Sequence, residues 1–239
     1  MLSKNEVKYI QNLHHKKTRD AEQLFIAEGV KILDEIVSSD YVIEKLYAVA
    51  TWQPATHVKT PVIIVSDEEL QRVTGLQTAN KVLAVVQQKP NNNSPETNGK
   101  LSLVLDAIRD PGNMGTIIRI ADWFGIQQII CSNDCVELYN PKVIQSTMGS
   151  FIRVAVAYKN LTEWLPQQTV NVYGAMLNGT NISQLNKIKE GLLVIGNEGK
   201  GISDELQQYI AQKITIPKFG GAESLNAAVA AGIILSYVV

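Results

Sequence analysis

The segment RDPGNMGTIIRIAD (109–122) places a turn rich in glycine and asparagine directly after the apolar run LSLVLDA (101–107). A strand that ends in such a turn and opens a helix is typical of phosphate binding, because helix N-termini attract anions. The spacing matches neither the dinucleotide fingerprint G-x-G-x-x-G nor the P-loop pattern G-x-x-x-x-G-K-[ST]. On its own, the segment is explained equally well by a tight Pro-Gly turn, with Asn113 as helix N-cap and Arg119 on the exposed helix face.

A second loop, VIGNEGKGISDEL (194–206), contains three glycines that let the backbone turn sharply and approach a ligand closely. Its acidic residue, Glu198, would repel an anion, so the loop favours a neutral or cationic ligand. The alternative is a surface loop that carries a solvated acid.

A third segment, ITIPKFGGAESLNAAVAAGIIL (214–235), joins a strand to a helix of small residues through a Gly-Gly loop. Such a helix allows another backbone to approach closely. We expect Ser224 to be its N-cap and Asn226 to project from its first turn. The alternative is that the segment has only a structural role, as an N-cap followed by an ordinary buried helix.

Regularly alternating elements surround these three segments. Predicted strands cover 101–107, 127–132, 151–158, 170–177, 191–196 and 213–217, and predicted helices cover 115–125, 141–149, 161–168, 182–188, 203–211 and 224–239. Continuous apolar strands separated by helices predict a parallel sheet covered on both faces. Ligands of such sheets bind beyond the carboxyl ends of the strands, which is where all three loops lie.

The stretch QQKPNNNSPETNGK (87–100) has no apolar residue and indicates a flexible linker. We therefore expect a domain at 1–89, a linker at 90–100 and a second domain at 101–239. The first domain is predicted to be a small α/β domain, with helices at 3–14, 30–39 and 66–75 and strands at 24–29, 45–50, 61–66 and 82–88. Capping boxes are expected at Ser3 with Glu6 and at Ser66 with Glu69.

The first twenty residues carry a cluster of basic side chains: Lys4, Lys8, Lys16, Lys17 and Arg19. They form either a solvated helix and turn or a contact to the RNA backbone, in which each cation would neutralise a phosphate. The formal net charge of −1 argues against a histone-like binder of polyanions, but a local basic patch remains compatible with RNA.

Composition narrows the class further. With 45% hydrophobic and 19% charged residues the chain is globular rather than disordered, and it shows neither a membrane span nor a signal peptide. Cys131 and Cys135 are too few for a disulfide scaffold and lack metal-ligand spacing, so we expect reduced thiols, no metal site and a cytoplasmic protein. The last helical pattern reaches Val239 without a cap, which is compatible with a longer natural chain.

Together, DPGNMGTIIRIAD, IGNEGKGIS and IPKFGGAESLNAAVAAGIIL resemble the three motifs of the SpoU family of RNA ribose 2′-O-methyltransferases, within the SPOUT superfamily. The resemblance covers residues 101–239. It implies a parallel-sheet domain with a deep trefoil knot, which periodicity alone could not indicate. Less specifically, the first ninety residues are similar to the RNA-binding domain of many members, which is similar to ribosomal proteins that bind kinked RNA.

The resemblance also implies a site and a cofactor. S-adenosylmethionine would lie in the knot of a homodimer, and the enzyme would methylate structured RNA, with large-subunit ribosomal RNA favoured over transfer RNA. The implied cofactor-binding residues are Gly196, Asn197, Ile216, Ser224, Leu225 and Asn226. The implied catalytic residues are Asn113, Arg119, Glu198, Ser224 and Asn226.

The role of Arg119 and the class of protein each leave alternatives. In family accounts the arginine accepts the hydroxyl proton, assisted by the substrate phosphate. A guanidinium rarely deprotonates, so Arg119 is equally interpreted as a clamp on the phosphate that stabilises the developing alkoxide. Other candidate classes are a non-catalytic RNA-binding or ribosome-assembly factor and a nucleotide-dependent oxidoreductase, the latter disfavoured by the missing glycine fingerprint.

Overall fold

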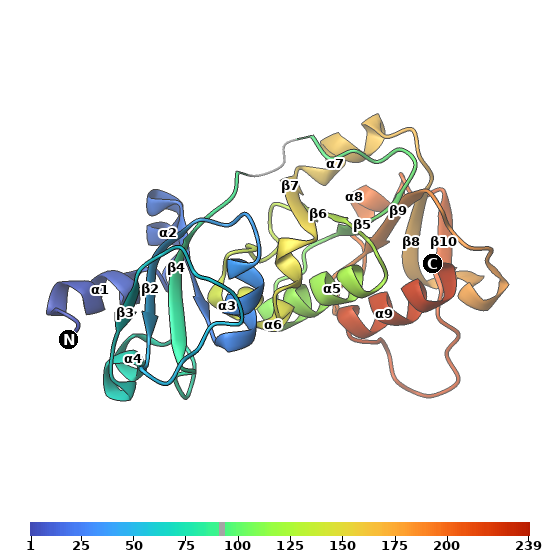
Figure 1. The fold of residues 1–239 in the computed structure, drawn as a ribbon. Helices are drawn as coiled ribbons and strands as arrows, with labels where there is room; N and C mark the ends of the chain where they lie inside the picture. Colours follow the sequence, from blue (N-terminus) through green and yellow to red (C-terminus); the bar gives the residue numbers. More distant parts are fainter. Residues whose placement is uncertain (91–93) are drawn as a thin grey trace. The chain divides into compact units, whose positions relative to one another are not determined.

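The computed structural model describes residues 1–90 and 94–239, which form two compact units (Figure 1). Unit 1 consists of Met1–Pro90 together with Glu137–Ile152. Unit 2 combines the described residues from Ser94 to Val136 with Arg153–Val239. Part of the expected linker at 90–100, namely residues 91–93, lies outside the described residues.

Unit 1 contains a mixed four-stranded sheet in the order β1-β4-β2-β3. Its strands are β1 (Leu24–Glu28), β2 (Ile43–Ala48), β3 (Val62–Ile64) and β4 (Val82–Gln87). β4 runs antiparallel to β1 and β2, whereas β2 and β3 are parallel. Its helices are α1 (Lys4–Asn12), α2 (Lys16–Glu22), α3 (Val30–Val37), α4 (Asp67–Val73) and α6 (Pro141–Thr147). This unit is the small α/β arrangement expected for the first part of the chain.

The two expected capping boxes differ in the structure. At α4 the box is complete, because Ser66 caps the backbone N–H of Glu69 while the Glu69 carboxylate accepts from the Ser66 N–H. At α1 only the serine half is present. There the Glu6 carboxylate accepts instead from the Tyr47 hydroxyl at 2.8 Å, so a tertiary contact replaces the local one.

The segment 137–152 of unit 1 packs α6 against β1. Tyr139 and Phe151 join Phe25 and Tyr41 in an aromatic cluster, with ring centroids 4.7 to 5.9 Å apart. Such pairs stabilise beyond the area they bury. This packing explains why the strand expected from residue 151 begins later: 150–152 form a 3-10 turn, and β7 covers Ala155–Lys159.

Unit 2 is built on a six-stranded sheet in the order β10-β8-β9-β5-β6-β7. Besides β7, its strands are β5 (Leu101–Leu105), β6 (Gln128–Ser132), β8 (Val172–Asn181), β9 (Gly191–Ile195) and β10 (Gln212–Thr215). Every paired strand is parallel to its neighbour, which confirms the expected parallel sheet. Figure 1 shows α7 (Leu161–Trp164) and α8 (Asp204–Gln207) on one side of this sheet, and α5 (Pro111–Trp123) and α9 (Ala227–Val238) on the other.

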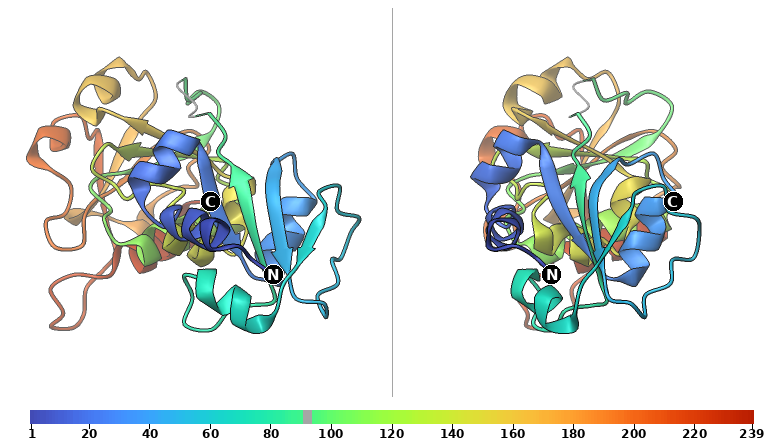
Figure 2. Two further views of the ribbon diagram at one scale, coloured as in Figure 1. Left: turned by 90° about the vertical axis from the view of Figure 1, so that its left-hand side faces the viewer. Right: turned by 60° about the vertical axis from the view of Figure 1, so that its left-hand side comes forward.

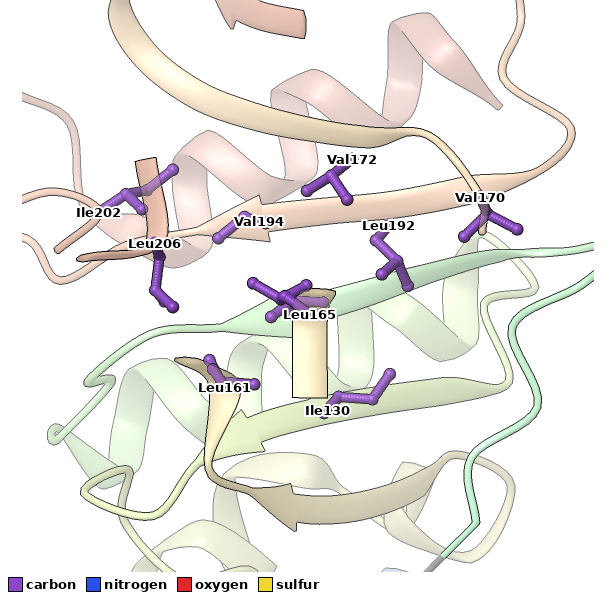
Figure 3. Close-up of a cluster of buried hydrophobic side chains, with 10 residues drawn as sticks. Ile130, Leu161, Leu165, Val170, Val172, Leu192, Val194, Ile202 and Leu206 are labelled. Atoms are coloured by element: carbon purple, nitrogen blue, oxygen red, sulfur yellow. The ribbon is translucent and has the colours of Figure 1, made fainter. Parts of the chain in front are cut away.

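The core of unit 2 explains why its strands were recognisable. β5, β6 and β9 are buried along their whole length, as strands covered on both faces must be. On the α7 side, Ile130 and Val194 from the sheet meet Leu161 and Leu165 from the helical segment and Leu206 from α8 (Figure 3).

The helices expected at 182–188 and 203–211 are shorter than their patterns suggested. Only 182–184 of the segment 182–188 are helical, in a 3-10 turn, because the Ile188 N–H donates to the carbonyl of Val238 at the end of α9. Only Asp204–Gln207 of the segment 203–211 form α8.

Candidate active site

The loop after β5 is fixed by a helix cap. The Asp110 carboxylate accepts a hydrogen bond of 2.8 Å from the backbone N–H of Asn113, and Pro111 occupies the first helical position. The alternative in which Asn113 caps this helix is therefore wrong. Since Asp110 satisfies the helix terminus, the side chain of Asn113 is left available for contacts elsewhere.

The Asn113 side chain joins the three sequence motifs. Its Nδ2 donates to the Glu198 carboxylate at 2.5 Å, in the loop after β9, and its Oδ1 accepts from the Asn226 Nδ2 at 2.8 Å, at the start of α9. We call these three residues the Asn113 bridge. Since 85 and 113 positions separate the partners along the chain, the loops predicted to meet at one edge of the sheet do so.

The loop after β9 is held in one shape by Asn197. Its side-chain oxygen accepts from the backbone N–H groups of Gly199 and Lys200, and its Nδ2 donates to the Ala107 carbonyl at 3.0 Å. The backbones of Asn197 and Gly201 also exchange two hydrogen bonds, of 3.0 and 2.8 Å. Asn197 thus shapes its own loop and ties it to the end of β5.

Gly196 permits this closure. A Cβ at that position would lie 2.2 Å from the carbonyl carbon of Gly201, which no side chain could tolerate. The expected cofactor-binding residue Gly196 therefore also has a structural reason to be glycine.

Asp106 is a site residue that sequence reasoning missed. It follows β5, is 6% exposed, and accepts a 2.7 Å hydrogen bond from the backbone N–H of Ser203, the N-cap of α8. Its own N–H donates to the Ile195 carbonyl. A carboxylate at the end of an otherwise apolar strand was the available signal, because a buried charge needs a hydrogen-bonding partner.

The third loop begins α9 later than expected. Asn226, rather than Ser224, is the N-cap: its Oδ1 accepts from the N–H groups of Ala228 and Val229 at 2.9 and 3.2 Å. Ser224 and Leu225 precede the helix and are exposed, while Ile216 lies half-buried just after β10. Asn226 therefore has two roles, because its oxygen caps α9 while its nitrogen donates to Asn113.

Arg119 lies on the exposed face of α5. Its distance from Asn113 along the helix axis is about 9 Å, six residues at the usual rise. Its guanidinium forms neither a hydrogen bond nor an ion pair with the described residues and is therefore available to a ligand.

The basic residues of the N-terminus divide into two groups. Lys4, Lys8, Lys16 and Lys17 are exposed. Arg19 is 1% exposed, donates to the Leu13 carbonyl at 2.9 Å and pairs with Glu137. Because a phosphate could reach Arg19 only by breaking this buried pair, we exclude it from the RNA contacts proposed below.

Both cysteines are free and buried. Burial raises the pKa of the Cys131 thiol, whereas a hydrogen bond from Cys131 lowers that of Cys135. In the described part of the chain, no group of His, Cys, Asp or Glu residues is arranged to hold a metal ion, and no helix is long and apolar enough to cross a bilayer.

Comparison with known proteins supplies the relatives of both units. Residues 100–236 match the SpoU rRNA Methylase family, and residues 4–84 match the MRM3-like substrate binding domain. The Bacillus subtilis 23S rRNA (guanosine(2553)-2′-O)-methyltransferase RlmP is 28% identical over 243 residues, which cover 99% of this chain and 97% of that protein.

Solved structures agree over nearly the whole chain. A TrmH-family protein from Porphyromonas gingivalis shares 34% identity with a TM-score of 0.86, covering 99% of this chain and 98% of its own. An AdoMet-bound rRNA methyltransferase from Sinorhizobium meliloti shares 28% identity with a TM-score of 0.86, covering 100% of this chain and 96% of its own.

Proposed function

We propose that this chain, which belongs to the SpoU rRNA Methylase family, transfers a methyl group from S-adenosylmethionine to a ribose 2′-hydroxyl of ribosomal RNA. The Asn113 bridge carries the proposal, because it brings the three family motifs to one edge of the sheet. The end-to-end match to a 23S rRNA 2′-O-methyltransferase supports the substrate class. The AdoMet-bound relative supports the cofactor.

The residues beyond β9 and β10 fit this cofactor. S-adenosylmethionine supplies a methyl group on a positively charged sulfur, and the Glu198 carboxylate offers that charge a complementary partner. Ile216 and Leu225 offer apolar surface for the adenine base of the cofactor. The backbone groups of 217–225 form no hydrogen bond with other described residues and so remain available to a ligand. We propose that Gly196, Asn197, Ile216, Ser224, Leu225 and Asn226 bind the cofactor.

Arg119 is proposed to bind the phosphate beside the target ribose. A guanidinium pairs with phosphate oxygens through two parallel hydrogen bonds, which also fix the orientation of the sugar. The same positive charge stabilises the oxygen as its proton leaves. Asn113 and Asn226 are proposed to position the loops of the site, with Glu198 as the charged partner of Asn113 and Ser224 as an exposed hydroxyl near Asn226.

We further propose the finer features that the family resemblance implies. These are a trefoil knot in residues 101–239, a linker at 90–100 and a domain at 1–89 that binds RNA in the manner of kinked-RNA-binding ribosomal proteins. Exposed lysines at positions 4, 8, 16 and 17 support the RNA contact. A cytoplasmic location is consistent with this substrate.

A homodimer through the knotted domain belongs to the same proposal. Exposed apolar side chains on the packed helices α5 and α9 support it: Trp123 is 84% exposed, and Val229 and Tyr237 are about half exposed. Surfaces of this kind commonly mark association sites.

The decisive experiment uses purified protein with radiolabelled S-adenosylmethionine and unmodified transcripts of 23S rRNA and, separately, of tRNA. Label in a 2′-O-methylnucleotide of the 23S transcript supports the proposal. Calorimetric cofactor binding without transfer to either RNA would indicate a non-catalytic RNA-binding factor. Transfer only to the tRNA transcript would show that tRNA, and not ribosomal RNA, is the substrate.

A further inference from the structure

The loop between β10 and α9, residues 216–226, carries an aromatic side chain that no other described residue covers. Phe219 is 97% exposed, and its neighbour Lys218 is exposed as well. Figures 1 and 2 show this loop projecting from the rest of unit 2. Phe219 therefore contributes nothing to the core of the unit.

A phenylalanine left in water forgoes the stabilisation that burial of its ring would provide. The adjacent Gly220 and Gly221 have open space where a Cβ would stand, so neighbouring atoms do not restrain the loop there. An exposed ring on an adaptable backbone is suited to contact a separate molecule.

The surroundings indicate what that molecule is. The loop ends at Asn226, which belongs to the Asn113 bridge. At most about 10 Å of extended chain separates Phe219 from Ile216 at the strand end. Lys218 beside the ring, Lys200 in the loop after β9 and Arg119 on α5 are exposed cations on the elements that form the site. Glu223 is the only acid within the loop sequence.

An exposed ring accompanied by cations is the combination that binds unpaired RNA, because bases stack on the ring while cations neutralise the phosphates. Building on the proposed function, we propose that Phe219 stacks on a base next to the methylated nucleotide while Lys218 pairs with the adjoining phosphate. Phe219 is then a substrate-binding residue that selects an unpaired conformation of the RNA.

The test compares Phe219→Ala, Phe219→Leu and Phe219→Trp with the control Leu177→Ala, which removes an exposed apolar side chain (72% exposed) on β8. Methyl transfer to an unmodified 23S rRNA transcript gives kcat and the KM for RNA. We expect the Ala and Leu variants to raise that KM about 5- to 100-fold, because a stacked base is lost. The Trp variant and the control should stay near wild type.

A second readout does not depend on activity. A single-stranded RNA oligonucleotide containing 2-aminopurine should lose fluorescence on binding wild-type protein and the Trp variant, and lose less with the Ala and Leu variants. Replacing the stacked base by an abasic spacer should abolish the affinity difference between wild type and Phe219→Ala.

Several results would overturn the inference. An unchanged KM and unchanged quenching in Phe219→Ala would show that the ring does not contact RNA. An equal loss of calorimetric affinity for S-adenosylmethionine would make Phe219 a cover for the cofactor. Dissociation seen by sedimentation would place it in an interface between copies. If wild type methylates no RNA, the proposed function fails, whereas the quenching comparison still decides the role of Phe219.

Discussion

Replacing Asn113 with aspartate tests whether the Asn113 bridge holds the three loops together. The substitution keeps the size of the side chain and an acceptor for Asn226, but it removes the Nδ2 that donates to Glu198 at 2.5 Å. Two carboxylates would then face each other. At 4 Å their repulsion is about 1 kcal/mol in water and about 4 kcal/mol at an effective dielectric of about 20.

Both side chains are half-buried, so the repulsion lies between these limits. The lost hydrogen bond to a charged group adds about 1.5–3 kcal/mol. Together these two terms amount to at least about 2.5 kcal/mol, which corresponds to a loss of about 70-fold or more in kcat/KM for methyl transfer. Steady-state assays with a 23S rRNA transcript measure this loss, and Asn186→Asp, at an exposed position of unit 2, controls for the added charge.

A second substitution should restore the contact. In Asn113→Asp combined with Glu198→Gln, the new amide donates to the new carboxylate, which reverses the original hydrogen bond. We expect this double variant to recover kcat/KM to within about fivefold of Glu198→Gln alone, since one ordinary hydrogen bond is worth about 1 kcal/mol. A double variant no more active than Asn113→Asp would refute the view that this contact organises the site.

Four further predictions concern other residues. Arg119→Ala should lower turnover at least about 100-fold, the usual effect of losing a group that stabilises developing negative charge, while calorimetric affinity for S-adenosylmethionine changes little; near-normal turnover would remove Arg119 from the site. Asn226→Asp keeps the cap of α9 but loses the donor to Asn113, so thermal stability should persist while methyl transfer falls, and a bulky Asn226→Leu should also weaken cofactor binding. Arg19→Met should lower the free energy of unfolding in urea by about 3 kcal/mol, because Glu137 loses its buried partner, and a loss below about 1 kcal/mol would contradict the importance of this pair. The backbone N–H groups of Ser66 and Leu2 hold the pKa of Glu69 below its ordinary value; the stabilisation that Glu69→Gln removes should therefore be fully present above the ordinary pKa of a glutamate and be lost as the pH falls below it, and a pH-independent difference would argue against it.

The sequence predicted the sheet of unit 2 and the edge where the loops meet for a simple reason. Strands such as Leu101–Leu105 and Gly191–Ile195 are buried on both faces, so their apolar runs are uninterrupted. Parallel strands place their carboxyl ends at one edge of the sheet. The sequence therefore predicted that the loops carrying Asn113 and Glu198 lie at the same edge.

Local chemistry was ambiguous where two residues of the same kind competed. Both Asp110 and Asn113 can cap a helix, and the choice of Asp110 was signalled by Pro111, which favours the first helical position. For Ser224 and Asn226 no comparable neighbour exists. There the N-cap residue, Asn226, also donates to Asn113. Because this partner lies 113 residues away in the sequence, the local sequence could not indicate which of the two residues is the cap.

The charge pattern of the N-terminus likewise did not indicate which basic side chains are buried. Arg19 stands among lysines in the sequence, yet its partner Glu137 lies 118 positions further on. A cation count cannot separate an exposed lysine from an arginine that has an acidic partner in the core, because the difference arises only when the chain folds.

The packing of residues 137–152 in unit 1 determines how this protein can be dissected. A fragment that stops at Pro90 would leave Phe25 and Tyr41 without the rings of Tyr139 and Phe151, and would strip Arg19 of its counter-ion. A fragment of residues 1–90 would therefore expose the aromatic side chains of Phe25 and Tyr41 and be prone to aggregation. If a protease cleaves the chain between residues 90 and 100, the two fragments should stay associated, because α6 of the C-terminal fragment packs against β1 of the N-terminal fragment.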